Sequence, residues 1–98
     1  MQLSPTKPSS QTQITLASGD LYIGKIKSGK PNGHGQIFYT DGSVYEGEFI
    51  NGLRHGEGKL TKESGYDYEG AFEEDKPHGE GVEYLSDGEY YEGEFVTG

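Results

Sequence analysis

The sequence contains no cysteine, no tryptophan and a single methionine, and only 30% of its 98 residues are hydrophobic. Without cysteine there is no disulfide, thiolate metal site or thiol nucleophile, which fits a reducing compartment. No apolar run exceeds three residues, and this excludes a transmembrane helix and the core of a secretory signal peptide. We therefore expect a cytoplasmic protein with one thin or strongly repetitive domain.

Basic residues are also scarce, with eight Lys and Arg against 17 Asp and Glu, a formal charge of −9 and a pI near 4.6. Nucleic-acid binding needs clustered positive charge and is not expected. Residues 63–98 hold 12 acids and one base, whereas residues 1–62 hold five acids and seven bases. This separation favours a basic protein partner for the C-terminal part, or contact between copies; the alternative is a merely solvated surface.

Glycine and tyrosine are abundant, with 17 and eight copies, and they recur with a period of 23 residues. The period divides the chain into whole repeats at 22–44, 45–67 and 68–90, with half repeats before them and at 91–98. Residues 1–13 lack the period and are rich in Ser, Pro, Gln and Thr, which predicts a disordered leader before an array at 14–98. The period is carried by Tyr22, Tyr45, Tyr68 and Tyr91, and by Gly24, Gly47, Gly70 and Gly93 two residues later.

Within one repeat, YEGEFI alternates as a strand does, NGLRHG supplies a turn and GKLTKE forms a second strand. Each repeat is therefore predicted to be one β-hairpin. The expected fold is all-β, an elongated single-layer antiparallel meander of stacked 23-residue hairpins with about eight strands. Equivalent residues then lie two strands apart, at about 9.6 Å.

The first strand of each repeat places a tyrosine, a glycine and a phenylalanine on one face, except that Ile26 takes the phenylalanine position in the first unit. A glycine between two rings leaves bare backbone on which a neighbouring ring can lie. Rings accessible in such a groove could bind a partner; alternatively, they serve only to hold the repeats together. The predicted partner-binding residues are Tyr22, Tyr45, Phe49, Tyr68, Phe72, Tyr91 and Phe95.

No residue pattern indicates catalysis, a metal or a cofactor. His55 and His78 are equivalent residues one repeat apart, too far from each other to share a metal ion, and His34 is out of their column. No His, carboxylate and hydroxyl recur at a spacing suited to nucleophile activation. The Gly-x-Gly pairs lack the third glycine of a dinucleotide fingerprint, and DGEYYEGEF lacks the alternating ligands of a calcium loop. We expect a protein that is not an enzyme.

The segments YEGEFINGLRHGEG and YEGAFEEDKPHGEGVEYLSDG resemble the MORN (membrane occupation and recognition nexus) repeat. The resemblance extends over residues 14–98. Local departures are Ile26, Asn32 at the position of the repeated histidine, and Asp75 at the position of a turn glycine, which predict local differences in loop shape. The resemblance implies a twisted single-layer sheet with an aromatic groove, and scaffolding, protein-binding or membrane-associated roles.

The leading hypothesis is a non-catalytic scaffold or protein-interaction module that binds a partner segment in the aromatic and glycine groove. A second hypothesis is edge-to-edge self-assembly through unpaired strands at the half repeats. A third, which follows from the resemblance, is an accessory array of a larger lipid kinase or methyltransferase. Association with a membrane or the cytoskeleton also stays open, although Lys25, Lys27 and Lys30 form the only basic cluster for anionic lipid.

Overall fold

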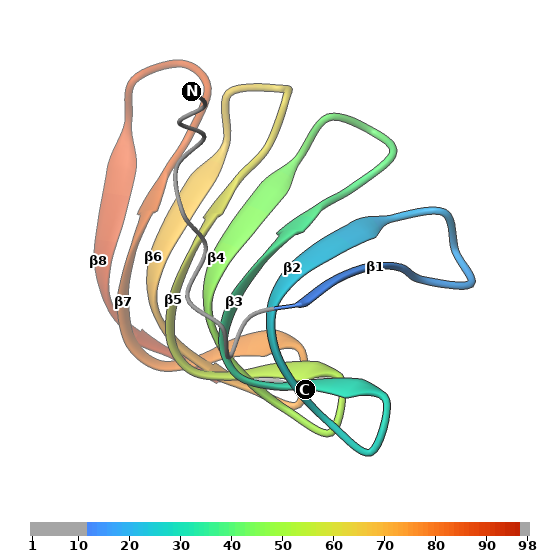
Figure 1. The fold of residues 1–98 in the computed structure, drawn as a ribbon. Helices are drawn as coiled ribbons and strands as arrows, with labels where there is room; N and C mark the ends of the chain where they lie inside the picture. Colours follow the sequence, from blue (N-terminus) through green and yellow to red (C-terminus); the bar gives the residue numbers. More distant parts are fainter. Residues whose placement is uncertain (1–11, 97–98) are drawn as a thin grey trace, which may run out of the picture.

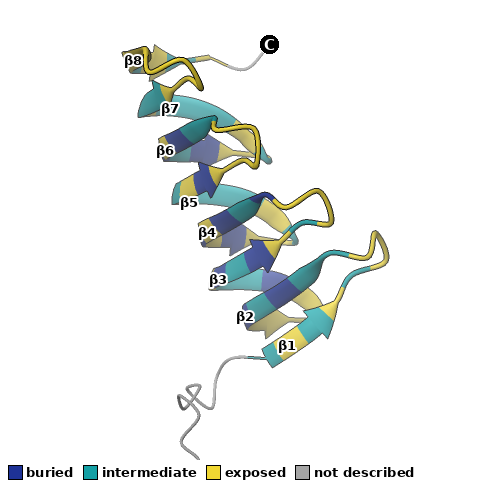
Figure 2. Cartoon of the chain, turned by 90° about the horizontal axis from the view of Figure 1, so that it is seen from above, coloured by how far each residue is buried: buried dark blue, intermediate teal, exposed yellow. Residues whose placement is uncertain are grey.

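The computed structural model describes residues 12–96 and contains a single antiparallel sheet whose eight strands pair in chain order (Figure 1). The described part is free of helices, so the predicted all-β meander is confirmed. Figure 2 shows the strands succeeding one another along the array, which measures 44 × 29 × 23 Å. The strands are β1 (Thr12–Thr15), β2 (Leu21–Lys27), β3 (Lys30–Phe38), β4 (Val44–Ile50), β5 (Leu53–Thr61), β6 (Asp67–Glu73), β7 (Lys76–Tyr84) and β8 (Tyr90–Phe95).

Among the described residues the sheet starts at Thr12, two residues before the predicted array boundary at residue 14. Thr12 and Gln13, the last residues of the predicted leader 1–13, belong to β1 and pair with Gly24 and Ile23 on β2. The rest of the predicted leader, residues 1–11, lies outside the described residues. So do residues 97 and 98 of the predicted last half repeat.

The two strands of each repeat are joined by a two-residue turn of the type expected for tight hairpins. In the second repeat the turn is Asn51-Gly52, with φ of 51° and 87°, and Ile50 pairs with Leu53 across it. Two successive positive φ values match a type I′ turn, for which Asn-Gly is the preferred pair. The third repeat has the same turn geometry at Glu74 and Asp75, with φ of 50° and 75°. The difference in loop shape expected at Asp75 is therefore wrong for this turn.

A β-bulge at the same place in every repeat bends the sheet. The register shifts between Gly24 and Ile26, and at the corresponding positions of β4 and β6. Bulges bend a strand and increase its local twist, and Figure 1 shows each hairpin curled into an arc. The curled hairpins stack into a trough. Because a single-layer sheet can enclose side chains only inside its curl, the buried tyrosine face is the concave one.

The core is a zigzag ladder of aromatic rings along the floor of the trough. Neighbouring rings meet edge to face, with centroids 4.9–5.2 Å apart and interplanar angles of 83–89°. This is the geometry that aromatic quadrupoles favour. Along the array the rings follow one another in the order Tyr22, Phe49, Tyr45, Phe72, Tyr68, Phe95 and Tyr91.

Each of the three buried ladder tyrosines, Tyr22, Tyr45 and Tyr68, is fixed at both ends. Its hydroxyl donates a hydrogen bond to the carbonyl three residues later in the same strand, as from Tyr45 to Glu48 at 3.0 Å and from Tyr68 to Ala71 at 2.8 Å. Its ring lies on a glycine of the next strand, so that a Cβ added at Gly58 would lie 2.2 Å from the Tyr45 hydroxyl oxygen. Burial raises the pKa of Tyr22, Tyr45 and Tyr68 above 10.0, so these hydroxyls stay protonated donors.

Candidate functional site

The structure brings all seven predicted binding residues together in the ladder but buries most of them. Tyr22, Tyr45 and Tyr68 are 0% exposed, and Phe49 and Phe72 are also buried. The surfaces of these five side chains are covered by contacts within the protein. Tyr91, which is 49% exposed, and the partly buried Phe95 offer surface at the β8 end of the array. Binding of a partner to the ladder therefore stays a prediction, and only Tyr91 and Phe95 have accessible side-chain surface for it.

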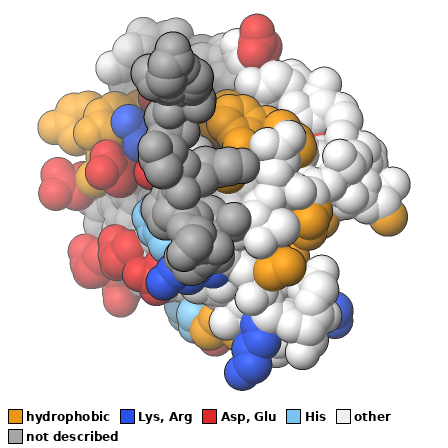
Figure 3. Space-filling model, in the orientation of Figure 1, with side chains coloured by type: hydrophobic (Ala, Val, Ile, Leu, Met, Phe, Trp, Pro, Cys, Tyr) orange, Lys and Arg blue, Asp and Glu red, His pale blue; other side chains and the backbone are white. Residues whose placement is uncertain are grey.

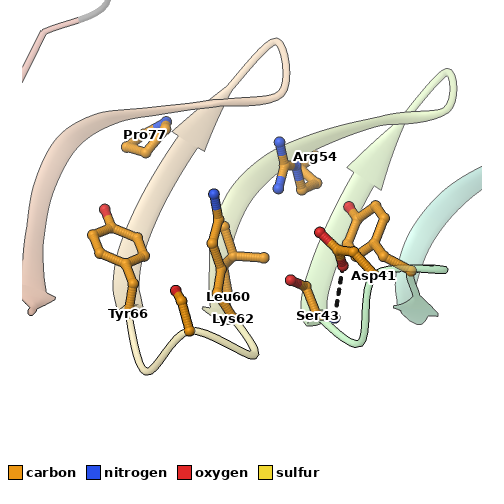
Figure 4. Close-up of a pocket in the computed structure, with 9 residues that line it drawn as sticks. Asp41, Ser43, Arg54, Leu60, Lys62, Tyr66 and Pro77 are labelled. Carbon is orange, nitrogen blue, oxygen red and sulfur yellow. Dashed lines mark hydrogen bonds between the residues drawn. The ribbon is translucent and has the colours of Figure 1, made fainter. Parts of the chain in front are cut away.

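A pocket of about 500 Å³ opens above the ladder, centred on the second repeat and lined by residues of all three whole repeats. Leu60 forms the floor of the pocket. Arg54 and Pro77, near the starts of β5 and β7, line one side. The opposite side is lined by residues near the turns that follow β3 and β5. Figure 4 shows Lys62, Tyr66 and Arg54 pointing into the space between these sides. The other residues that line it are Tyr39, Asp41, Ser43 and Ser64.

Arg54 connects the pocket to the ladder. The guanidinium carbon lies 5.4 Å from the ring centroid of Phe72, 5.8 Å from that of Tyr45 and 6.0 Å from that of Tyr39. At such distances a guanidinium is attracted by the faces of aromatic rings. The side chain is 18% exposed, and its Nε lies 2.9 Å from Oδ1 of Asp75. Arg54 thus covers the ladder and joins the second repeat to the turn of the third.

Asp75 is held by hydrogen bonds as well as by charge. Its Oδ1 accepts the backbone N–H of Arg54 at 3.0 Å, and its backbone carbonyl accepts Nη2 of Arg54 at 2.6 Å. Its own N–H donates to the Arg54 carbonyl at 2.9 Å. These bonds offset the cost of an L residue at a positive φ, which is about 1–2 kcal/mol. They explain why an aspartate can stand where two other repeats have glycine.

We expect Asp75→Ala to destabilise the fold by about 1–3 kcal/mol, because it removes an acceptor from the partly buried Arg54 and keeps the backbone strain. Asp75→Gly should cost less, since it loses the same acceptor but relieves the strain. Urea unfolding followed by circular dichroism would rank the two variants. Equal losses, or a larger loss for Asp75→Gly, would show that the strain at this turn is negligible.

Glu83 introduces a negative charge on the concave face of the third repeat. It occupies the position that Ile14, Ile37 and Leu60 hold in the earlier units, and it is partly buried. Its Oε2 accepts a hydrogen bond from the Tyr66 hydroxyl at 2.8 Å. Burial, together with this carboxylate, raises the pKa of Tyr66. The trough therefore changes from basic side chains in the second repeat to an acidic one in the third.

The opposite face of the sheet is strongly acidic. Glu46, Glu69 and Glu92 are exposed there, in one row across the sheet. In Figure 3 the acidic side chains gather on the side of the array where β8 lies. His34 contacts Glu46 with 3.7 Å between Nε2 and Oε2, and His78 contacts Glu73 with 3.4 Å between Nε2 and Oε1.

Neither a metal-ligand cluster nor a long apolar helix occurs in the described part of the chain. Within residues 12–96 no three His, Cys, Asp or Glu side chains are grouped so that they could hold a metal ion. That same part of the chain contains no helix with the length and apolar character needed to cross a bilayer.

Reasoning from the sequence missed the residues of the pocket. Arg54 occupies the repeat position that Pro31 and Pro77 hold in the other repeats, and Glu83 occupies a position that is aliphatic in the other repeats. Both residues depart from the repeat pattern, and comparing equivalent positions of the repeats could have detected them. The pocket itself could not be seen that way, because its opposite sides come together only through the curl of the hairpins.

Comparison with known families agrees with this architecture. The sequence signature of the MORN repeat matches residues 22–44, 45–65 and 68–90, which correspond to the hairpins β2–β3, β4–β5 and β6–β7. These matches cover more than half of the chain. No curated protein matches it significantly. The MORN repeat is generally a non-catalytic module for interaction with proteins or membranes, and this chain belongs to the MORN-repeat family.

Proposed function

We propose that the protein is a non-catalytic scaffold, an interaction module that binds a segment of a partner protein in its trough. The observation that carries this proposal is the pocket of about 500 Å³ above the aromatic ladder. Its volume falls within the range of about 300–1,000 Å³ that is typical of binding pockets. Leu60, the floor of the pocket, packs in the same buried cluster as the ladder rings, so little conformational entropy is lost there when a partner binds.

The side chains of the pocket define the chemistry of the partner segment. Leu60, Pro77 and the rings of Tyr39 and Tyr66 line it with apolar surface that suits an apolar anchor residue. Glu83, in the neighbouring repeat, offers a carboxylate that is held by Tyr66 and has no ion-pair partner among the described residues. We infer a segment with an apolar anchor and a basic residue that reaches Glu83, consistent with the acidic character of the C-terminal part.

Selection of displayed random peptides against the protein would test the proposal. Selected peptides should combine an apolar and a basic residue, and Glu83→Gln should weaken their binding about tenfold or more, because a charge-assisted hydrogen bond is lost. Glutamine preserves the size of the side chain and its acceptor for Tyr66. Affinity would be measured by fluorescence anisotropy.

Glu80→Gln is the matched control, because Glu80 lies on the same strand, is exposed on the outer face and carries the same charge. Binding that is sensitive to Glu80 and insensitive to Glu83 would place recognition on the outer face and contradict a trough site. Failure to select any peptide, combined with binding to anionic vesicles, would favour a membrane role instead.

A further inference from the structure

The trough is narrowed by two side chains that approach each other from its opposite sides. Tyr39 follows β3 on one side, and Arg54 lies near the start of β5 on the other. The guanidinium carbon of Arg54 is 6.0 Å from the centroid of the Tyr39 ring. Arg54 is held there, because its Nε and Nη2 donate hydrogen bonds to Oδ1 and to the backbone carbonyl of Asp75. A segment bound in the pocket meets this contact if it continues toward the first repeat.

Arg54 keeps hydrogen-bond donors for a ligand at this contact. A guanidinium has five N–H donors, and Asp75 accepts one from Nε and one from Nη2. The two donors of Nη1 and the second donor of Nη2 have no partner among the described residues. They include the pair at the tip of the guanidinium, which can bind both oxygens of a carboxylate. Figure 4 shows the Arg54 side chain directed into the pocket.

Lys62 supplies a second positive charge, from the opposite side of the pocket. Its Nζ lies 5.6 Å from the centroid of the Tyr66 ring, and it has no ion-pair partner within the part of the chain that the structure describes. Asp41 is the acid that lines the same pocket. Asp41 is exposed, so solvent screens its charge, whereas the Arg54 side chain is only 18% exposed and its charge is screened less. This end of the pocket therefore favours an anion.

We propose that the anion is the terminal carboxylate of the partner chain, so that the segment bound in the trough is a C-terminus with an apolar last residue. This inference rests on the proposed function and adds the point at which the segment ends. The apolar side chain packs on Leu60, the floor of the pocket, and the carboxylate accepts hydrogen bonds from Arg54 and is attracted by Lys62. An internal acidic residue fits less well, because the chain beyond it would have to separate Arg54 from Tyr39.

The distance between the two ends of the site gives the position of the basic residue. Leu60 on β5 and Glu83 on β7 are both paired with Tyr68 on β6, one from each side. They therefore lie two strand spacings apart, at about 9.6 Å. An extended segment covers this distance in about three residues. The partner C-terminus thus carries Lys or Arg three residues before its apolar last residue.

Two small probes test the terminal carboxylate directly. N-acetyl-leucine carries the apolar side chain and the carboxylate, and N-acetyl-leucinamide has a neutral amide in place of the carboxylate. In titrations of the full chain followed by heteronuclear NMR, the amide should bind at least about tenfold more weakly, because it loses the charge-assisted hydrogen bonds. The acid should shift the Nε–H resonance of Arg54 and the backbone resonance of Leu60. Equal binding of the two probes, or shifts confined to the outer face, would overturn the proposal.

The contribution of Lys62 is tested with a matched control. Lys62→Gln should weaken the binding of N-acetyl-leucine by about threefold or more, because it removes the charge opposite Arg54. Lys59→Gln should leave the affinity unchanged, since Lys59 carries the same charge and is also exposed but lies on the outer face, opposite Glu46. Equal weakening by both substitutions would show attraction without a defined site and would contradict the proposal.

The peptide GSKGSL connects this test to the proposed function. Its free acid should bind at least about tenfold more tightly than the same peptide with an amidated C-terminus, and Glu83→Gln should weaken the free acid. If both forms bind equally and both depend on Glu83, the terminal carboxylate is wrong and the proposed function stands. If N-acetyl-leucine and both peptides fail to bind while selected internal segments bind through Glu83, again only this inference is wrong. If the peptide selection also yields nothing, the trough site itself is wrong.

Discussion

Gly58→Ala is expected to lower the free energy of unfolding by about 3 kcal/mol, although it adds a single methyl group. The new Cβ would lie 2.2 Å from the Tyr45 hydroxyl oxygen and 2.5 Å from two carbons of its ring. Tyr45 is fully buried between Phe49 and Phe72, and its hydroxyl is bonded to the Glu48 carbonyl. The ring therefore has no free space into which it could move, and the strands must separate locally.

Gly52→Ala is the matched control for this prediction. Gly52 has a φ of 87° and nothing within 4 Å of an added Cβ, whereas Gly58 is crowded but has no positive φ. The control should therefore cost only about 1 kcal/mol, from backbone strain. Urea unfolding of both variants would separate crowding from strain. A loss at Gly58 no larger than that at Gly52 would mean that the ladder tyrosines are free to shift.

The second large effect is expected from Phe72→Ala, which should destabilise the fold by about 3–5 kcal/mol. Phe72 is buried and meets Tyr45 and Tyr68 edge to face on its two sides, and Arg54 lies over its ring. Its removal leaves a cavity that interrupts the ladder in the middle. A domain of this size is stable by only about 5–10 kcal/mol, so the variant is expected to be partly unfolded at 37 °C.

Phe95→Ala removes an equivalent ring near the end of the ladder and should cost about half as much or less, because Phe95 is only partly buried. The two variants would be compared by thermal unfolding and by the dispersion of their NMR spectra. If both lost the same stability, the ladder would act as one cooperative unit in which position has no effect.

The architecture could be predicted from the sequence because the 23-residue period places chemically identical residues at identical positions. Turn residues such as Asn51 and Gly52 specify their own local geometry, and the alternation around Tyr45 specifies which face is apolar. The curl of the hairpins could not be predicted, since it arises from a bulge that is defined by the pairing of two strands. Without the curl, rings that the structure buries were expected to line an open groove.

The candidate site, like the fold, could be predicted from the sequence only in part. Tyr91 and Phe95 were predicted as binding residues from their positions in the repeat; Tyr91 is 49% exposed and Phe95 is partly buried, because β8 is the last strand of the described sheet. Arg54 and Glu83 were not singled out, because their roles depend on neighbours more than 15 residues away, Asp75 and Tyr66. A sequence pattern defined within one repeat carries no information about such contacts between repeats.

The strict succession of strands also has a mechanical consequence. Every strand pairs only with its neighbours in the chain, and the strands succeed one another along the array. Tension applied between the two ends would therefore break the hydrogen bonds of one strand pair after another. It would not load all strand pairs together in shear. Hairpins would open in turn from the ends. Under load, such an array would behave as an extensible tether that yields in steps of one repeat.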